Sequence, residues 1–161
     1  MGMTPETETA ESELEALVVD LSRTGSVVFV FGTGSSGSLT THLVGRTRPV
    51  FRGPADRRWW HVEHGAADSK WSLSVRLDQV EAVRFVREPN PFPSFPGQES
   101  LTVRFEAADR SVLFCYLGDL YDGQQLRPER LGEWERLRER YGCRDHSLVV
   151  NGSLRPAAVA A

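Results

Sequence analysis

Residues 71–77, with the sequence WSLSVRL, alternate without a break between apolar and polar side chains. A period of two is typical of a β-strand that buries one face and exposes the other. The predicted buried face consists of Trp71, Leu73, Val75 and Leu77. The chain is therefore expected to build a sheet with one covered side.

Strand patterns recur between residues 27 and 117. Apolar or alternating runs predict further strands at 27–31, 39–44, 48–51, 59–63, 80–88, 100–106 and 111–117. The segment PNPFPSFPG, residues 89–97, contains four prolines and is predicted to connect two strands, because proline cannot donate a ladder hydrogen bond. Phe92 and Phe95 within it are candidates for an apolar lid or a dimer contact.

One amphipathic helix is predicted on each side of this β region. Residues 11–22 carry apolar side chains at helical spacing, and Ser12 and Glu15 form an S-x-x-E capping pattern. A second helix is expected from near Pro128 to a stop at Gly142. Because βαβ alternation is absent, the predicted class is α+β. We expect one large antiparallel sheet of about seven to nine strands, flanked by N- and C-terminal helices.

The chain length of 161 residues suits one domain. We expect a disordered tail over residues 1–10, a single domain over 11–144 and a loose tail over 145–161. The acidic N-terminus does not resemble a signal peptide, and no apolar run approaches the roughly 18 residues of a membrane span. A cytoplasmic location without a membrane partner is therefore predicted.

Arginines cluster between residues 46 and 58, at Arg46, Arg48, Arg52, Arg57 and Arg58. Such a patch could attract phosphate, nucleic acid or carboxylates, whereas the simpler interpretation is a solvated pair of strands. The first predicted helix is acidic. For that reason a nucleic acid partner is not expected.

The segment WWHVEH holds the candidate ligand residues. His61 and His64 are three positions apart, which on a strand places them on opposite faces unless His64 already lies in the turn. Trp59 and Trp60 are adjacent, so one is expected in the core and the other at the surface or beside a flat apolar ligand.

Sequence motifs that would by themselves indicate a catalytic or cofactor-binding site are weak or absent. The pattern GxGxxG at residues 32–37 is not followed by a helical pattern, so a hairpin loop is predicted there in place of a dinucleotide site. Cys115 lies in an apolar run and is predicted to be buried. No nucleophile elbow, P-loop or HExxH motif is present, and no catalytic residue is predicted.

A longer pattern begins with the strand at 73–77 and the AVRFVRE strand at 82–88, followed by the proline-rich loop at 89–97. It continues with strands at 99–110 and 112–118 and a helix at 131–141. This order and spacing resembles the bacterial intracellular haem-utilisation family. The family includes one-lobed haem carriers of the ChuX and HutX type and two-lobed haem-degrading proteins of the HemS type. The resemblance implies a HemS/ChuX-like fold, a homodimer and haem as the ligand.

The sequence departs from this family at the expected ligands. Carriers of the family tend to have a Gly-His pair where this chain has Leu73 and Ser74. A second histidine, expected near Phe31, is also absent. The nearest replacements as axial ligand are His61 and His64, with His42 third. Under the resemblance, Trp59 or Trp60 flanks the porphyrin, while Arg76 and Arg58 meet its propionates.

Two functions from different classes remain open. The first is a haem-binding, haem-carrier-like protein of iron acquisition, whose partner is haem or another flat apolar ligand. The second is the same fold with haem binding lost, acting as a non-enzymatic binding or protein-interaction module. If the chain is an enzyme, the resemblance implies haem degradation, with haem as the substrate.

Overall fold

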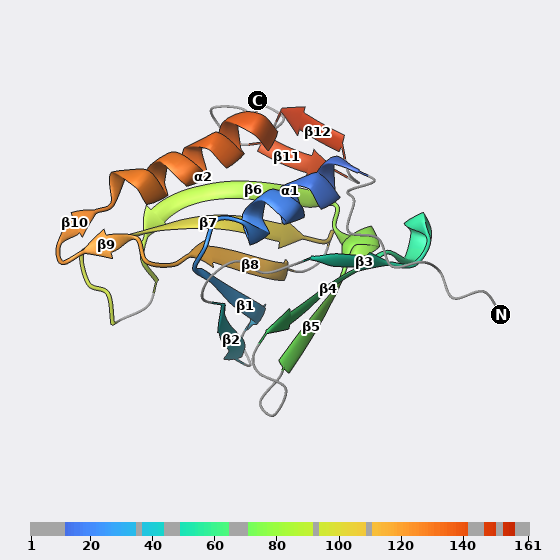
Figure 1. Cartoon of the computed structure of the whole chain (residues 1–161), viewed down its shortest axis with the longest axis horizontal. Helices are drawn as coiled ribbons and strands as arrows, with labels where there is room; N and C mark the ends of the chain where they lie inside the picture. Colours follow the sequence, from blue (N-terminus) through green and yellow to red (C-terminus); the bar gives the residue numbers. More distant parts are fainter. Residues whose placement is uncertain are drawn as a thin grey trace.

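In the computed structural model (Figure 1), the described residues form two larger antiparallel sheets, two short hairpins and two α-helices, which confirms the α+β class. The structure describes residues 12–34, 37–43, 49–64, 71–91, 94–108, 111–141, 147–150 and 153–156. Within these ranges, only the backbone is described for residues 31–34, 37–43, 63–64, 71, 147–150 and 153–156.

The larger sheet has five strands in the order β2-β1-β8-β7-β6. Its strands are β1 (Val27–Gly34), β2 (Gly37–Leu43), β6 (Ala82–Pro89), β7 (Glu99–Glu106) and β8 (Ser111–Leu117). The smaller sheet has the order β3-β4-β5, with β3 (Val50–Arg52), β4 (Trp59–His64) and β5 (Trp71–Arg76). The prediction of one sheet with seven to nine strands was wrong in the number of strands, because the strands divide between these two sheets. Between β5 and β6 the chain turns through the short helix η2 (Leu77–Gln79), and β6 pairs with β7 instead of β5.

The remaining elements lie around this frame. The helices are α1 (Glu13–Ser22) and α2 (Pro128–Tyr141), and a single 3-10 turn, η1 (Ala55–Arg57), separates β3 from β4. A hairpin of β9 (Tyr121–Asp122) and β10 (Gln125–Leu126) precedes α2. Residues 145–161, expected as a loose tail, contain a second hairpin, β11 (Ser147–Val150) and β12 (Ser153–Pro156), with β11 beside β6.

The helix α1 begins as its capping pattern predicts. Ser12 is the N-cap, and its hydroxyl oxygen accepts a hydrogen bond from the backbone N–H of Glu15 at 3.2 Å. The face with Leu14, Leu17 and Val18 is buried in the core. Neither helix of the described ranges has the length and apolarity needed to cross a bilayer.

The core lies between the two sheets and the helices. Both helices cover the same face of the five-stranded sheet (Figure 1). The smaller sheet turns Phe51, Trp60 and Val75 toward this core, and the Trp60 ring meets the Phe29 ring edge-on with centroids 5.6 Å apart. The opposite face of the smaller sheet therefore points outward, and it carries the predicted ligand residues.

Candidate functional site

The outward side of β4 and β5 brings together four residues from the sequence prediction. In the antiparallel register Trp59 pairs with Arg76, and His61 pairs with Ser74. Their strand neighbours Trp60 and Val75 belong to the opposite, buried face. We call the set of Trp59, His61, Ser74 and Arg76 the outer face.

His61 and Ser74 are joined directly. The Nδ1 atom of His61 lies 2.8 Å from the Ser74 hydroxyl oxygen. A hydrogen bond at one ring nitrogen fixes the orientation of an imidazole, as in metal-binding histidines whose second nitrogen is held by a neighbour. The structure thus places an imidazole beside Ser74 from the adjacent strand.

Trp59 and Arg76 form the other half of the outer face. The guanidinium carbon of Arg76 lies 5.2 Å from the centroid of the Trp59 ring, which is cation–π geometry. Arg76 also binds Asp78 through two hydrogen bonds, Nε to Oδ1 at 2.7 Å and Nη2 to Oδ2 at 2.5 Å. This pairing raises the pKa of Arg76 and lowers the pKa of Asp78.

Two of the predicted site residues lie in the interior. Trp60 is fully buried between Phe29 and Phe105. Arg58 is buried as well, and its guanidinium binds Glu15 and the Gly53 carbonyl. Trp59 is thus the tryptophan at the surface, and any ligand site on the outer face is built without Trp60 and Arg58.

Two further histidines, His64 and His42, are placed only by their backbones. His64 ends β4 opposite Trp71, three positions after His61, so strand alternation assigns the two positions to opposite faces. His42 lies in β2 opposite Val28. The side chains of His64 and His42 lie outside the described residues. Among the described residues, no three His, Cys, Asp or Glu side chains are grouped as a metal site.

The structure also shows where the GxGxxG segment and Cys115 lie. The GxGxxG segment joins β1 to β2, with Gly34 opposite Gly37, which confirms a hairpin there. Cys115 is buried as predicted, and this burial raises the pKa of its thiol. The arginines Arg46 and Arg48 lie outside the described residues.

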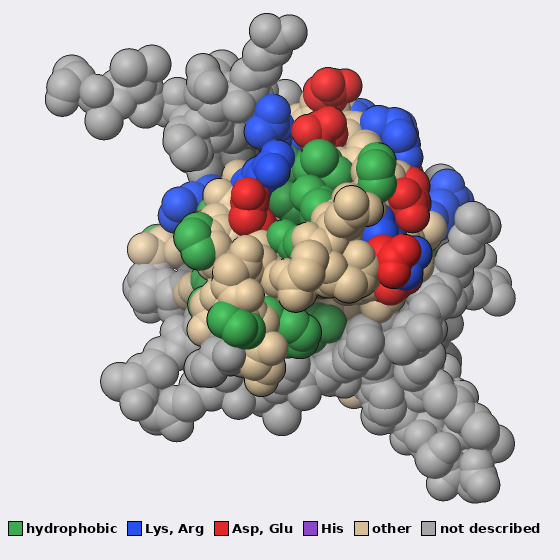
Figure 2. Space-filling view, turned by 90° about the vertical axis from the view of Figure 1, so that its left-hand side faces the viewer, with side chains coloured by type: hydrophobic (Ala, Val, Ile, Leu, Met, Phe, Trp, Pro, Cys, Tyr) green, Lys and Arg blue, Asp and Glu red, His purple; other side chains and the backbone are tan. Residues whose placement is uncertain are grey.

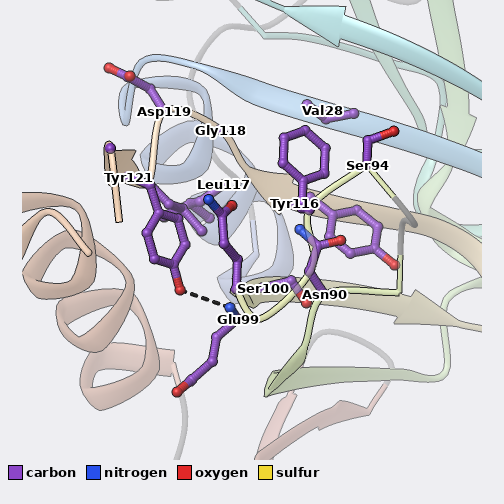
Figure 3. A pocket seen from close by; sticks show the side chains of 14 residues that line it. Val28, Asn90, Ser94, Glu99, Ser100, Tyr116, Leu117, Gly118, Asp119 and Tyr121 are labelled. Atoms are coloured by element: carbon purple, nitrogen blue, oxygen red, sulfur yellow. Dashed lines mark hydrogen bonds between the residues drawn. The ribbon is translucent and has the colours of Figure 1, made fainter. Parts of the chain in front are cut away.

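A cavity that the sequence did not predict lies at one end of the larger sheet. Its volume is about 490 Å³, within the usual range for small-molecule sites. Its described lining residues come from the connection between β6 and β7, the start of β7, the end of β8 with the loop that follows it, the β9 hairpin and Val28 of β1. In Figure 3, Tyr121 closes one side, while Tyr116 and Asn90 lie on the other. Phe95, expected as an apolar lid or a dimer contact, is among the lining residues.

The chain is similar to known proteins in structure alone. No family model matches it, and no curated protein matches it. It is similar to the crystal structure of protein AGR_C_4470 from Agrobacterium tumefaciens, with 17% identity and a TM-score of 0.57, over 87% of this chain and 72% of that one. It is also similar to the crystal structure of ChuX, with 12% identity and a TM-score of 0.52, over 87% of this chain and 78% of ChuX. The chain therefore has a ChuX-like fold.

Proposed function

We propose that this chain binds haem as its cargo and acts as a carrier-like protein of iron acquisition in the cytoplasm. The observation that carries the proposal is the pairing of His61 with Ser74. Directly opposed residues of an antiparallel pair have Cβ atoms about 4.5–5.5 Å apart. His61 thus supplies an imidazole, an established haem ligand, one strand away from the position where the carriers tend to have theirs.

The rest of the outer face suits a flat anionic macrocycle. The Trp59 indole provides an apolar ring beside His61, and the Arg76 guanidinium is a donor for a propionate. Arg52 lies opposite Trp59 on β3, so a second guanidinium borders the same surface. As the family resemblance implies, we expect a homodimer, which sedimentation of the purified protein would test.

A hemin titration followed at the Soret band tests the proposal. We expect a saturable, red-shifted band at about one equivalent for the native chain. His61→Ala should abolish the shift, and His64→Ala is the matched control that separates the two candidate ligands. The double variant His61→Ala/Ser74→His moves the imidazole across the strand pair and should restore binding. A shift that survives His61→Ala but not His64→Ala would transfer the role to His64.

A second candidate function is the same fold without haem binding, as a non-enzymatic interaction module. Two observations favour it: Ser74 replaces the expected histidine, and Arg76 is already engaged by Asp78. A featureless titration of the native chain would support this candidate. Gradual loss of an existing Soret band in the presence of a reductant would instead indicate haem degradation.

A further inference from the structure

The cavity at the end of the larger sheet has mostly apolar walls. Most of the exposed wall surface is apolar, and the aromatic and aliphatic residues of the lining are Val28, Phe95, Tyr116, Leu117, Leu120 and Tyr121. Figure 2 looks at this end of the molecule and shows apolar side chains gathered near its centre, with acidic and basic side chains around them. Cavities that are mostly apolar, with a few polar groups, are the usual form of small-molecule sites.

The charges around the cavity disfavour an anionic ligand. No lysine, arginine or histidine is among the described lining residues, whereas two carboxylates, Glu99 and Asp119, are. Each carboxylate is ion-paired outside the lining, Glu99 with Arg87 and Asp119 with Arg127. An anion that enters would lose its hydration and gain no cationic partner, which is costly in an apolar site.

The polar groups of the walls are neutral. Asn90, Ser94, Gln98 and Ser100 contribute amides and hydroxyls to the lining. Tyr116 is also a lining residue, and burial raises the pKa of its phenol, so the phenol stays protonated at neutral pH. Such groups bind the hydrogen-bonding edge of an uncharged molecule.

Hydrogen bonds hold the deeper walls in place. The Tyr121 hydroxyl accepts a hydrogen bond from the backbone N–H of Glu99 at 2.7 Å, which ties β9 to the start of β7 (Figure 3). Arg130 of α2 donates from Nε to the Gly118 carbonyl at 3.0 Å. Phe95, by contrast, is 47% exposed at the rim. The cavity is therefore preformed on one side and bordered by a solvent-facing aromatic ring on the other.

We propose that this cavity is a binding site for a neutral, flat aromatic or heteroaromatic molecule. Its lining shares no residue with the outer face of β4 and β5. The absence of cations from its described walls also disfavours a porphyrin with two propionates there. The site is thus independent of the haem proposal, and either can hold without the other.

Three indoles that differ in charge provide the test, because their ring systems are the same. Indole, tryptamine and indole-3-acetate are titrated into the ¹⁵N-labelled full chain in the absence of hemin. We expect saturable shifts for indole at the amides of Phe95, Tyr116 and Tyr121. Binding of indole-3-acetate should be roughly tenfold or more weaker, because its carboxylate finds no cation. Tryptamine should bind no more tightly than indole, because its ammonium meets carboxylates, Glu99 and Asp119, that are already ion-paired.

Variants show whether the cavity is responsible. Phe95→Ala removes a solvent-facing ring and should weaken indole binding several-fold without unfolding the chain. Val50→Ala on β3 is the matched control, since it removes apolar atoms outside the lining and should leave indole binding unchanged. The proposal is overturned if indole does not saturate or if indole-3-acetate binds more tightly. It is also overturned if the shifts fall on His61 and Trp59, or if Phe95→Ala leaves the affinity for indole unchanged.

Discussion

The Arg58 guanidinium donates two hydrogen bonds to a single carboxylate oxygen of Glu15, from Nε at 2.9 Å and from Nη2 at 2.7 Å. Both residues are buried, and they are 43 positions apart in the chain. The pair fastens α1 to the segment between β3 and β4, where Arg58 also donates to the Gly53 carbonyl at 2.8 Å. An arginine that the sequence suggested for ligand binding thus holds the first helix on the domain.

Breaking this pair on one side should destabilise the fold strongly. Glu15→Gln removes a carboxylate that neutralises the buried Arg58 guanidinium, and the expected loss in the free energy of unfolding is about 3–5 kcal/mol. The double variant Glu15→Leu/Arg58→Met removes both charges and should recover most of that loss. Urea unfolding followed by tryptophan fluorescence measures each value.

The exposed pair Arg87–Glu99 is the matched control for Glu15→Gln. Its side chains are 43% and 44% exposed, so Glu99→Gln should cost no more than about 1 kcal/mol. Equal losses for Glu15→Gln and Glu99→Gln would contradict a structural role for the buried pair.

Local pattern predicted the elements of this fold better than their pairing. The alternation of residues 71–77 placed β5 correctly, and the capping pattern placed the start of α1. Alternation shows which side chains share a face, but it does not show which strands are neighbours. The pairing of β1 with β8 joins Val27 to Leu117 across most of the chain, and only tertiary packing selects it.

For the candidate site too, local pattern predicted the residue types but not how the fold brings them together. Adjacent tryptophans predicted that one would be buried, yet the sequence could not decide between Trp59 and Trp60, because either face of β4 could have met the core. The contact between His61 and Ser74 depends on the register of β4 and β5, which no local signal specifies. The cavity unites residues from distant parts of the chain, from Val28 of β1 to the β9 hairpin, and its sequence signal was the aromatic content of the proline-rich connection.

The two buried indoles should respond differently to the same substitution. Trp134 donates from Nε1 to the Thr102 carbonyl at 3.1 Å, whereas the Nε1 of Trp60 is buried without a hydrogen-bond partner in the described structure. Trp60→Phe removes an unsatisfied donor, and Trp134→Phe removes a hydrogen bond. We therefore expect Trp134→Phe to cost about 1–2 kcal/mol more than Trp60→Phe in urea unfolding. A larger loss for Trp60→Phe would contradict this.

The Arg76–Asp78 pair should make stability depend on pH in the acid range. The hydrogen bonds from Arg76 lower the pKa of Asp78 in the folded state. A lowered pKa stabilises the fold fully above the pKa of the unfolded chain, about 4, and this contribution disappears as pH falls through the folded value. Asp78→Asn should therefore be less stable than the native chain at pH 7, and the difference should vanish in strong acid. A difference that stays constant from pH 7 to pH 2 would exclude this linkage.

Arg130 is expected to be irreplaceable by lysine. From α2 its guanidinium donates to the Gly118 carbonyl at 3.0 Å and to the Ser26 carbonyl at 2.7 Å, and it also bonds the Thr24 carbonyl. These acceptors flank the start of β1 and the end of β8, so one side chain joins the helix to two central strands. A lysine ammonium is a single point of donation and cannot span three separated carbonyls.

Arg130→Lys should therefore lower the free energy of unfolding by at least about 2 kcal/mol, because buried carbonyls lose their donors. Arg138→Lys, on the same helix and stacked on Trp134 with its guanidinium carbon 5.3 Å from the ring centroid, is the matched control and should lose less than about 1 kcal/mol. Since Gly118 also lines the cavity, Arg130→Lys should weaken indole binding as well, which Arg138→Lys should not. If both variants unfold at the same urea concentration, the three-carbonyl contact is not what holds α2 to the sheet.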